Sequence, residues 1–226
     1  MEELDERKLL LIPAMPSSGT SALAGVLHYL GVNMGNCNEE DQTEKRGYEM
    51  FEDDDTWRYA SRPNRDADRW EGKLTGTILR IRGYVNYRLW KDEGPVGAKI
   101  PAVLCMYDRE IETLPILTLN VHRPFEQSVM SDRRTMVKQG KYKPIQGDID
   151  KILAANRMRA SDMGTCYVAK MDLFSHHEPI VNVTFDELIS QREEMVHGIA
   201  DTIDIGSTEE QIQSAIDFLD KDKKHS

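Results

Sequence analysis

The chain has 226 residues, with 29 Lys or Arg against 39 Asp or Glu, which gives a formal net charge of −10. With 39% hydrophobic and 30% charged residues, the composition is that of a globular protein and excludes a disordered or fibrous one. The acidic balance argues against broad, non-specific binding to nucleic acid or to membranes, which requires a basic surface.

Short apolar runs predict the strands. Residues 9–12, with the sequence LLLI, form a continuous apolar run that is typical of a strand buried on both faces. The Pro-, Ser- and Gly-rich segment from Pro13 to Gly19 predicts a tight turn after it. Similar runs predict further strands at residues 96–100, 116–121 and 180–185.

Apolar residues at helical spacing predict a helix after this turn, and Gly31 ends the pattern. Residues 36–75 are polar and highly charged, which predicts loop with short helix. Further helices are predicted at residues 125–138, 149–163, 211–219 and, along one apolar face, from 186 to 203. Strands that alternate with helices predict an α/β fold: one three-layer domain over residues 1–226, with a mostly parallel sheet flanked by helices.

The cysteines and the N-terminal region indicate the compartment. Cys37, Cys105 and Cys166 lie far apart and lack metal-ligand spacing, so we expect reduced thiols and no metal. The apolar residues 9–34 follow an acidic leader and are interrupted by Pro and Gly, unlike a signal peptide or a membrane span. We therefore expect a cytoplasmic protein that binds neither membranes nor nucleic acid.

The first turn is a candidate anion site. It lies between a buried strand and a helix start, where backbone N–H groups and the positive helix end attract phosphate. A plain turn with a Ser or Thr N-cap is the simpler alternative, and no Walker motif is present because no lysine follows Gly19. The candidate binding residues are Ser17, Ser18, Gly19, Thr20 and Ser21.

A second candidate site follows the third predicted strand. Residues 120–124, NVHRP, end this strand and enter a helix, and Ser131 follows Arg123 by eight residues. A guanidinium pairs with two phosphate oxygens, and a serine about two helical turns further on lies on the same face. The pattern predicts a second contact to a phosphorylated ligand.

Residues 12–21, IPAMPSSGTS, resemble the 5′-phosphosulfate loop of the sulfotransferase family, whose usual form is P-[KR]-[ST]-G-T-[ST]. Residues 27–35, 47–53, 97–101 and 181–189 resemble further segments of that family in the same order. The resemblance implies a P-loop-like fold and 3′-phosphoadenosine 5′-phosphosulfate (PAPS) as co-substrate, with Arg123 and Ser131 holding its 3′-phosphate. The implied reaction transfers a sulfuryl group to a hydroxyl or amine of a small molecule, saccharide or peptide, without a metal.

The catalytic residues are predicted from what sulfuryl transfer requires: a cation near the leaving phosphate and a base near the acceptor. The family's loop cation is replaced by Ser17, so Lys99, at the end of a predicted strand, is the best candidate cation. Glu52 is the best candidate base and Asp53 the second, although this acidic run is also typical of a solvated surface.

Two other functions stay open. A nucleotide or small-molecule kinase of related fold would use ATP and Mg²⁺, but the Walker lysine and a recognisable Walker-B aspartate are absent. A non-catalytic nucleotide-binding protein is favoured by Ser17 in place of the loop cation. The sequence carries no recognisable code for the acceptor or for the oligomeric state.

Overall fold

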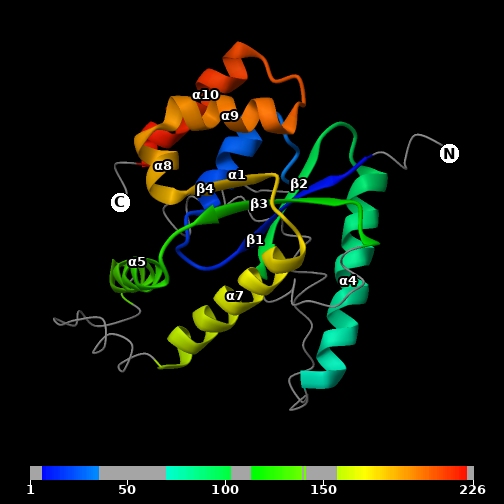
Figure 1. Ribbon diagram of the computed structural model, residues 1–226, viewed down its shortest axis with the longest axis vertical. Helices are drawn as coiled ribbons and strands as arrows, with labels where there is room; N and C mark the ends of the chain where they lie inside the picture. The colour runs from blue at the N-terminus through cyan, green and yellow to red at the C-terminus, as the bar shows by residue number, and fades with distance from the viewer. Residues whose placement is uncertain (1–6, 36–69, 103–112, 139, 141–156, 223–226) are drawn as a thin grey trace.

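The computed structural model describes residues 7–35, 70–102, 113–138, 140 and 157–222. Four strands form the sheet, and neighbouring strands are parallel; they are β1 (Leu9–Ala14), β2 (Val96–Pro101), β3 (Ile116–His122) and β4 (Val181–Thr184). Their order is β2-β1-β3-β4 (Figure 1). Each strand overlaps a predicted apolar run, so the strand predictions are confirmed.

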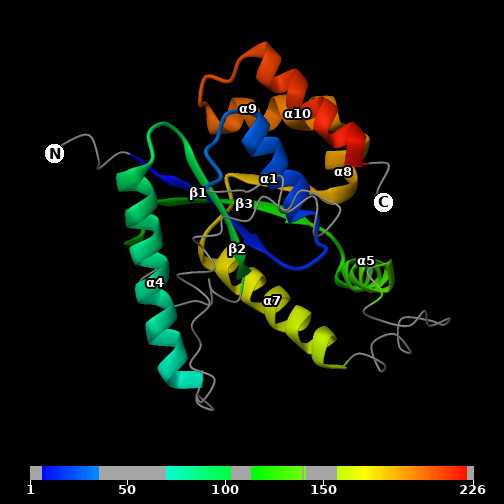
Figure 2. The ribbon, with the colours of Figure 1, turned by 180° about the vertical axis from the view of Figure 1, so that it is seen from behind.

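Helices cover both faces of the sheet. Leu10 and Ile12 of β1 belong to the apolar core beneath α1 (Thr20–Tyr29), α8 (Phe185–Ser190), α9 (Arg192–Ile203) and α10 (Glu209–Asp222). Leu9 and Leu11 belong to the opposite core, with α4 (Trp70–Lys91) and α7 (Arg157–His176). Figures 1 and 2 show these two layers, and α5 (Phe125–Lys138) at the end of β3. The predicted three-layer α/β fold is confirmed.

Three helices differ from the sequence predictions. α4 begins at Trp70, so it includes residues 70–75 of the segment that was expected to be loop with short helix, and its buried apolar residues lie further along, from Ile81 to Leu89. α7 continues to His176, well beyond the predicted end at residue 163. The single helix predicted from residue 186 is two helices, because Gln191 adopts a non-helical conformation between α8 and α9.

β1 and β3 separate toward their carboxyl ends. Their pairs extend from Leu9 with Ile116 to Leu11 with Thr118, whereas the β1–β2 pairs continue to Ala14. From β1 the chain continues to β2 on one side, and β3 lies on the other side. In parallel sheets such a switch point, at the carboxyl ends of the strands, is where ligands bind.

Pro13 explains where this ladder ends. The Leu9 N–H donates to the Pro115 carbonyl, so the odd-numbered residues of β1 and β3 direct their backbone groups toward each other. Pro13 is the next odd-numbered residue after Leu11, and it has no N–H with which to continue the pairing. The carbonyl of Val121, an odd-numbered residue of β3, therefore faces the gap between the two strands.

Candidate functional site

The loop of residues 15–19 connects β1 to α1 and turns sharply. Ser17 and Gly19 have positive φ angles of 58° and 89°, which for Ser17 is a strained conformation. The backbone N–H and the hydroxyl of Ser18 both donate to the Met15 carbonyl, at 3.3 and 2.8 Å. These two hydrogen bonds close the loop. Because Ser18 is buried and its hydroxyl donates to Met15, this hydroxyl does not donate to a ligand.

The helix start after this loop presents free backbone donors. The Gly19 carbonyl accepts from the N–H groups of Ala22 and Leu23, which begins α1. The N–H groups of Gly19, Thr20 and Ser21 have no acceptor among the residues that the structure describes. Because the dipole of α1 adds partial positive charge here, the three amides suit an anion.

Phe185, the first residue of α8, packs against Gly19. A Cβ built on Gly19 would lie 2.3 Å from Cδ2 of Phe185, closer than any such contact allows. The ring is held in place by a capping box at the start of α8, in which Thr184 and Glu187 exchange hydrogen bonds. Gly19 is therefore required both for the turn and for the space that the ring fills.

Gly19→Ala is expected to destabilise the protein by about 1–3 kcal/mol, because a side chain at positive φ is strained and must displace the Phe185 ring. Denaturant unfolding measures this change. Gly198→Ala is the matched control: Gly198 lies exposed in α9 with open space around it, so alanine should stabilise by about 0.5–1 kcal/mol. Equal stability of Gly19→Ala and the wild type would contradict the packing argument.

Lys99 approaches the loop from β2. It pairs with Ile12 of β1, and its side chain is 2% exposed. Its Nζ donates to the Ser21 Oγ at 2.9 Å. The structure thus brings Lys99 to the first turn of α1, although the two residues are 78 positions apart.

Arg123 approaches the same loop from the end of β3. Its Nη1 donates to the Ser17 carbonyl at 3.2 Å, and its guanidinium carbon lies 4.6 Å from the centre of the Phe185 ring. Burial lowers the pKa of Arg123, an effect that Asp186 opposes and Arg134 reinforces. Its Nε is buried and has no hydrogen-bond partner in the described part of the chain, so this guanidinium retains a donor for a ligand.

Two serines of α5 differ in their burial. Ser131 is half-buried, and its hydroxyl has no hydrogen bond to any residue that the structure describes. Ser128, one turn earlier, is fully buried, and its hydroxyl is also unpartnered among the described residues. The sequence analysis did not name Ser128 as a candidate phosphate ligand. The signal in the sequence is its position one helical turn into α5.

The predicted bases Glu52 and Asp53 lie outside the described residues, as do Cys37 and Cys105. Cys166 is buried in an apolar cluster with Met15 and Ala102. In residues 7–35, 70–102, 113–138, 140 and 157–222, no group of three or more His, Cys, Asp or Glu could hold a metal ion. None of the helices described is both long and apolar enough to cross a membrane.

Comparisons with known proteins give one distant similarity to report. No family model matches the chain, and no curated protein matches it in sequence. The chain is similar to a sulfotransferase domain from the curacin biosynthetic pathway, with a TM-score of 0.46 and 13% sequence identity, over 92% of this chain and 77% of that one.

The donors described above fit a phosphate or sulfate group. Backbone amides of α1, the ammonium of Lys99 and the guanidinium of Arg123 come from three separate segments and meet around residues 17–21. Such donors supply positive charge and directed hydrogen bonds without a metal. The arrangement can therefore bind a polyanion and stabilise charge that develops on it.

Proposed function

We propose that this protein is a sulfotransferase that moves a sulfuryl group from PAPS to a hydroxyl or amine acceptor. The observation that carries the proposal is the approach of Lys99 and Arg123, from opposite sides of β1, to the loop and first turn of α1, whose first amide N–H groups have no acceptor among the described residues. The resemblance of residues 12–21 to a 5′-phosphosulfate loop favours PAPS as the anion that binds there.

In this proposal the binding residues divide the ligand between them. The amides of Gly19, Thr20 and Ser21 hold the 5′-phosphosulfate, while Ser17 and Ser18 shape the loop. Arg123 holds the 3′-phosphate together with a serine of α5, for which Ser131 is the predicted residue. The Nε of Arg123 has no hydrogen-bond partner among the described residues, and in this proposal it supplies a second donor to the phosphate.

The reaction breaks the bond between sulfur and the bridging oxygen of the phosphosulfate and forms a bond between sulfur and the acceptor atom. Lys99 stabilises the negative charge that grows on the leaving phosphate. Glu52, or Asp53 as the second choice, takes the acceptor proton. The remaining barrier is lowered by positioning, because the transition state of such transfers is loose.

A ligand-binding experiment tests the proposal. We expect 3′-phosphoadenosine 5′-phosphate to raise the melting temperature, since a ligand at 100 times its Kd stabilises by about 2.7 kcal/mol. ATP with Mg²⁺ should shift it far less. A larger shift with ATP and Mg²⁺ would favour the related-fold kinase.

An activity measurement separates the catalytic from the non-catalytic alternative. Transfer of radiolabelled sulfate from PAPS to a panel of phenols, amines, saccharides and tyrosine peptides should give labelled product. If the bisphosphate binds but no acceptor is labelled, the protein is a non-catalytic nucleotide-binding relative.

A further inference from the structure

One face of α7 is an apolar stripe with a single charged member. Met163 packs against Val129 of α5, Cys166 packs against Met15, and Leu173 belongs to the core beneath the sheet. Lys170 lies in the same stripe and is 5% exposed. An apolar side chain of equal length at this position would avoid the cost of burying a charge.

The ammonium of Lys170 lies at the gap between β1 and β3. Its Nζ donates to the Val121 carbonyl at 2.7 Å. This carbonyl faces the gap because Pro13 ends the β1–β3 ladder before it. Arg123 follows Val121 by two residues, so Lys170 supports the segment that carries the arginine.

The charge of Lys170 has no described counter-charge. Besides the bond to Val121, its ammonium lies 5.9 Å from the centre of the Phe174 ring, and no described carboxylate forms an ion pair with it. Burial lowers the pKa of Lys170 to about 8. At neutral pH this buried ammonium is therefore mostly charged, beside a switch point whose other donors suit an anion.

We propose that Lys170 is a positioning residue of the anion site, which holds the end of β3 that carries Arg123 and adds a positive charge at the gap between β1 and β3. This inference rests on the proposed function, in which the ligand carries several negative charges. The role explains why a lysine, and not an apolar residue, occupies this buried position on α7.

The test compares Lys170→Met with the wild type between pH 6.5 and 9.5, by calorimetric measurement of the Kd for 3′-phosphoadenosine 5′-phosphate. At pH 7 the variant should bind about tenfold more weakly. The wild type should lose affinity above about pH 8, so that the two profiles converge by pH 9.5. A lysine with only a structural role would leave the affinity of the folded protein and its pH profile unchanged, whatever the melting temperature of the variant.

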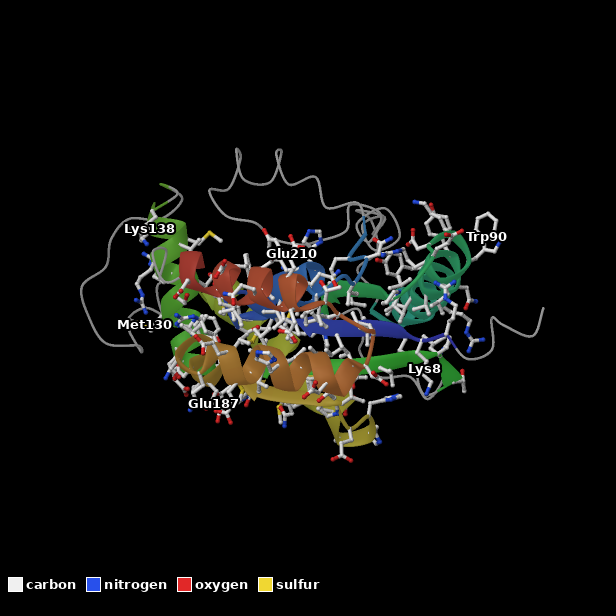
Figure 3. The ribbon with its side chains drawn as sticks, turned by 90° about the horizontal axis from the view of Figure 1, so that it is seen from above. Lys8, Trp90, Met130, Lys138, Glu187 and Glu210 are labelled. Atoms are coloured by element: carbon white, nitrogen blue, oxygen red, sulfur yellow. The ribbon has the colours of Figure 1, made fainter. Side chains whose placement is uncertain are left out.

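Other titratable groups require a control, although β1 carries none. The charged or titratable groups on the neighbouring segments are His122 of β3 and Arg123 directly after it, Glu126, Asp132, Arg133, Arg134 and Lys138 of α5, and Arg82, Tyr84, Tyr87, Arg88 and Lys91 of α4, which shares a core with α7; on α7 itself, Cys166, Tyr167 and Asp172 lie within four residues of Lys170. They are unchanged in Lys170→Met, so the difference between the two profiles isolates Lys170. Lys8→Met is the control for loss of a positive charge. Lys8 lies at the opposite end of the molecule from Lys138, the last residue of α5 (Figure 3), so the Kd and pH profile of Lys8→Met should equal those of the wild type.

The outcomes separate this inference from the proposed function. Equal affinities and pH profiles for Lys170→Met and the wild type would overturn the role of Lys170 and leave the proposed function standing. If the wild type does not bind the bisphosphate, the proposed function fails. Inorganic pyrophosphate then replaces the bisphosphate as the probe for the anion site. If pyrophosphate raises the melting temperatures of the wild type and Lys170→Met equally, or raises neither, the inference about Lys170 is overturned as well.

A second variant guards against misfolding. Lys170→Gln retains an N–H donor for the Val121 carbonyl and lacks the charge. If Lys170→Met does not fold, Lys170→Gln should show the tenfold weaker binding at pH 7. Wild-type affinity in this variant would overturn the role of the charge.

Discussion

Lys99→Ala is expected to lower the turnover of sulfuryl transfer by about 10²–10³, the usual cost of losing a group that stabilises transition-state charge. Ser17 cannot supply this charge, whereas the Lys99 ammonium lies 2.9 Å from the Ser21 hydroxyl at the start of α1. The amides of α1 still hold the ground state, so the Kd for 3′-phosphoadenosine 5′-phosphate should rise only a few-fold. Steady-state kinetics and calorimetry measure the two quantities, and this combination indicates a contact made mainly in the transition state.

Two further variants define the role of Lys99. Lys99→Met fills the buried space without the charge and should be as inactive as Lys99→Ala, which separates chemistry from packing. Ser17→Lys in the Lys99→Ala background restores the cation that the family carries in the loop and should recover part of the turnover. Near-normal turnover of Lys99→Met would show that the leaving group is stabilised elsewhere.

Arg123→Ala should weaken the binding of 3′-phosphoadenosine 5′-phosphate by about 2–5 kcal/mol, the cost of removing one partner of a buried, charge-assisted contact. Adenosine 5′-phosphate lacks the 3′-phosphate, so its binding free energy should fall much less in this variant. Isothermal titration of both ligands measures the difference. The selectivity is expected because, in the proposed function, Arg123 contacts the 3′-phosphate, which adenosine 5′-phosphate lacks.

Conservative and distant variants control this result. Arg123→Lys keeps the charge without the planar fork, so it should bind the bisphosphate with an intermediate affinity. Arg192→Ala breaks an ion pair with Asp220 between α9 and α10 and should leave both affinities unchanged. Equal weakening of both ligands in Arg123→Ala would mean that Arg123 only supports the loop through Ser17.

The β1–loop–α1 unit was predictable because its signals are local. A continuous apolar run makes a strand that is buried on both faces, Gly19 permits a positive φ, and apolar residues at helical spacing follow. The remaining strands were predictable for the same reason. The residue pattern alone therefore suffices to name residues 17–21 as a candidate anion site.

Local signals failed where tertiary packing decides the element. The buried Lys170 interrupts the apolar stripe of α7, and sequence reasoning ended that helix early. Gln191 adopts a non-helical conformation, which divides a continuous apolar face into α8 and α9. Neither change leaves a distinctive residue pattern.

The α/β fold class, the position of the loop and the candidate residues Lys99 and Arg123 follow from the amino-acid pattern alone. The contacts of the two cations with Ser21 and Ser17, the packing of Phe185 on Gly19 and the bond from Lys170 to the carbonyl of Val121 become visible only in the folded chain. They depend on strand order and register, which bring the carboxyl ends of β1, β2 and β3 together whatever their separation along the chain. The order β2-β1-β3-β4 and the missing N–H of Pro13 set where those ends separate.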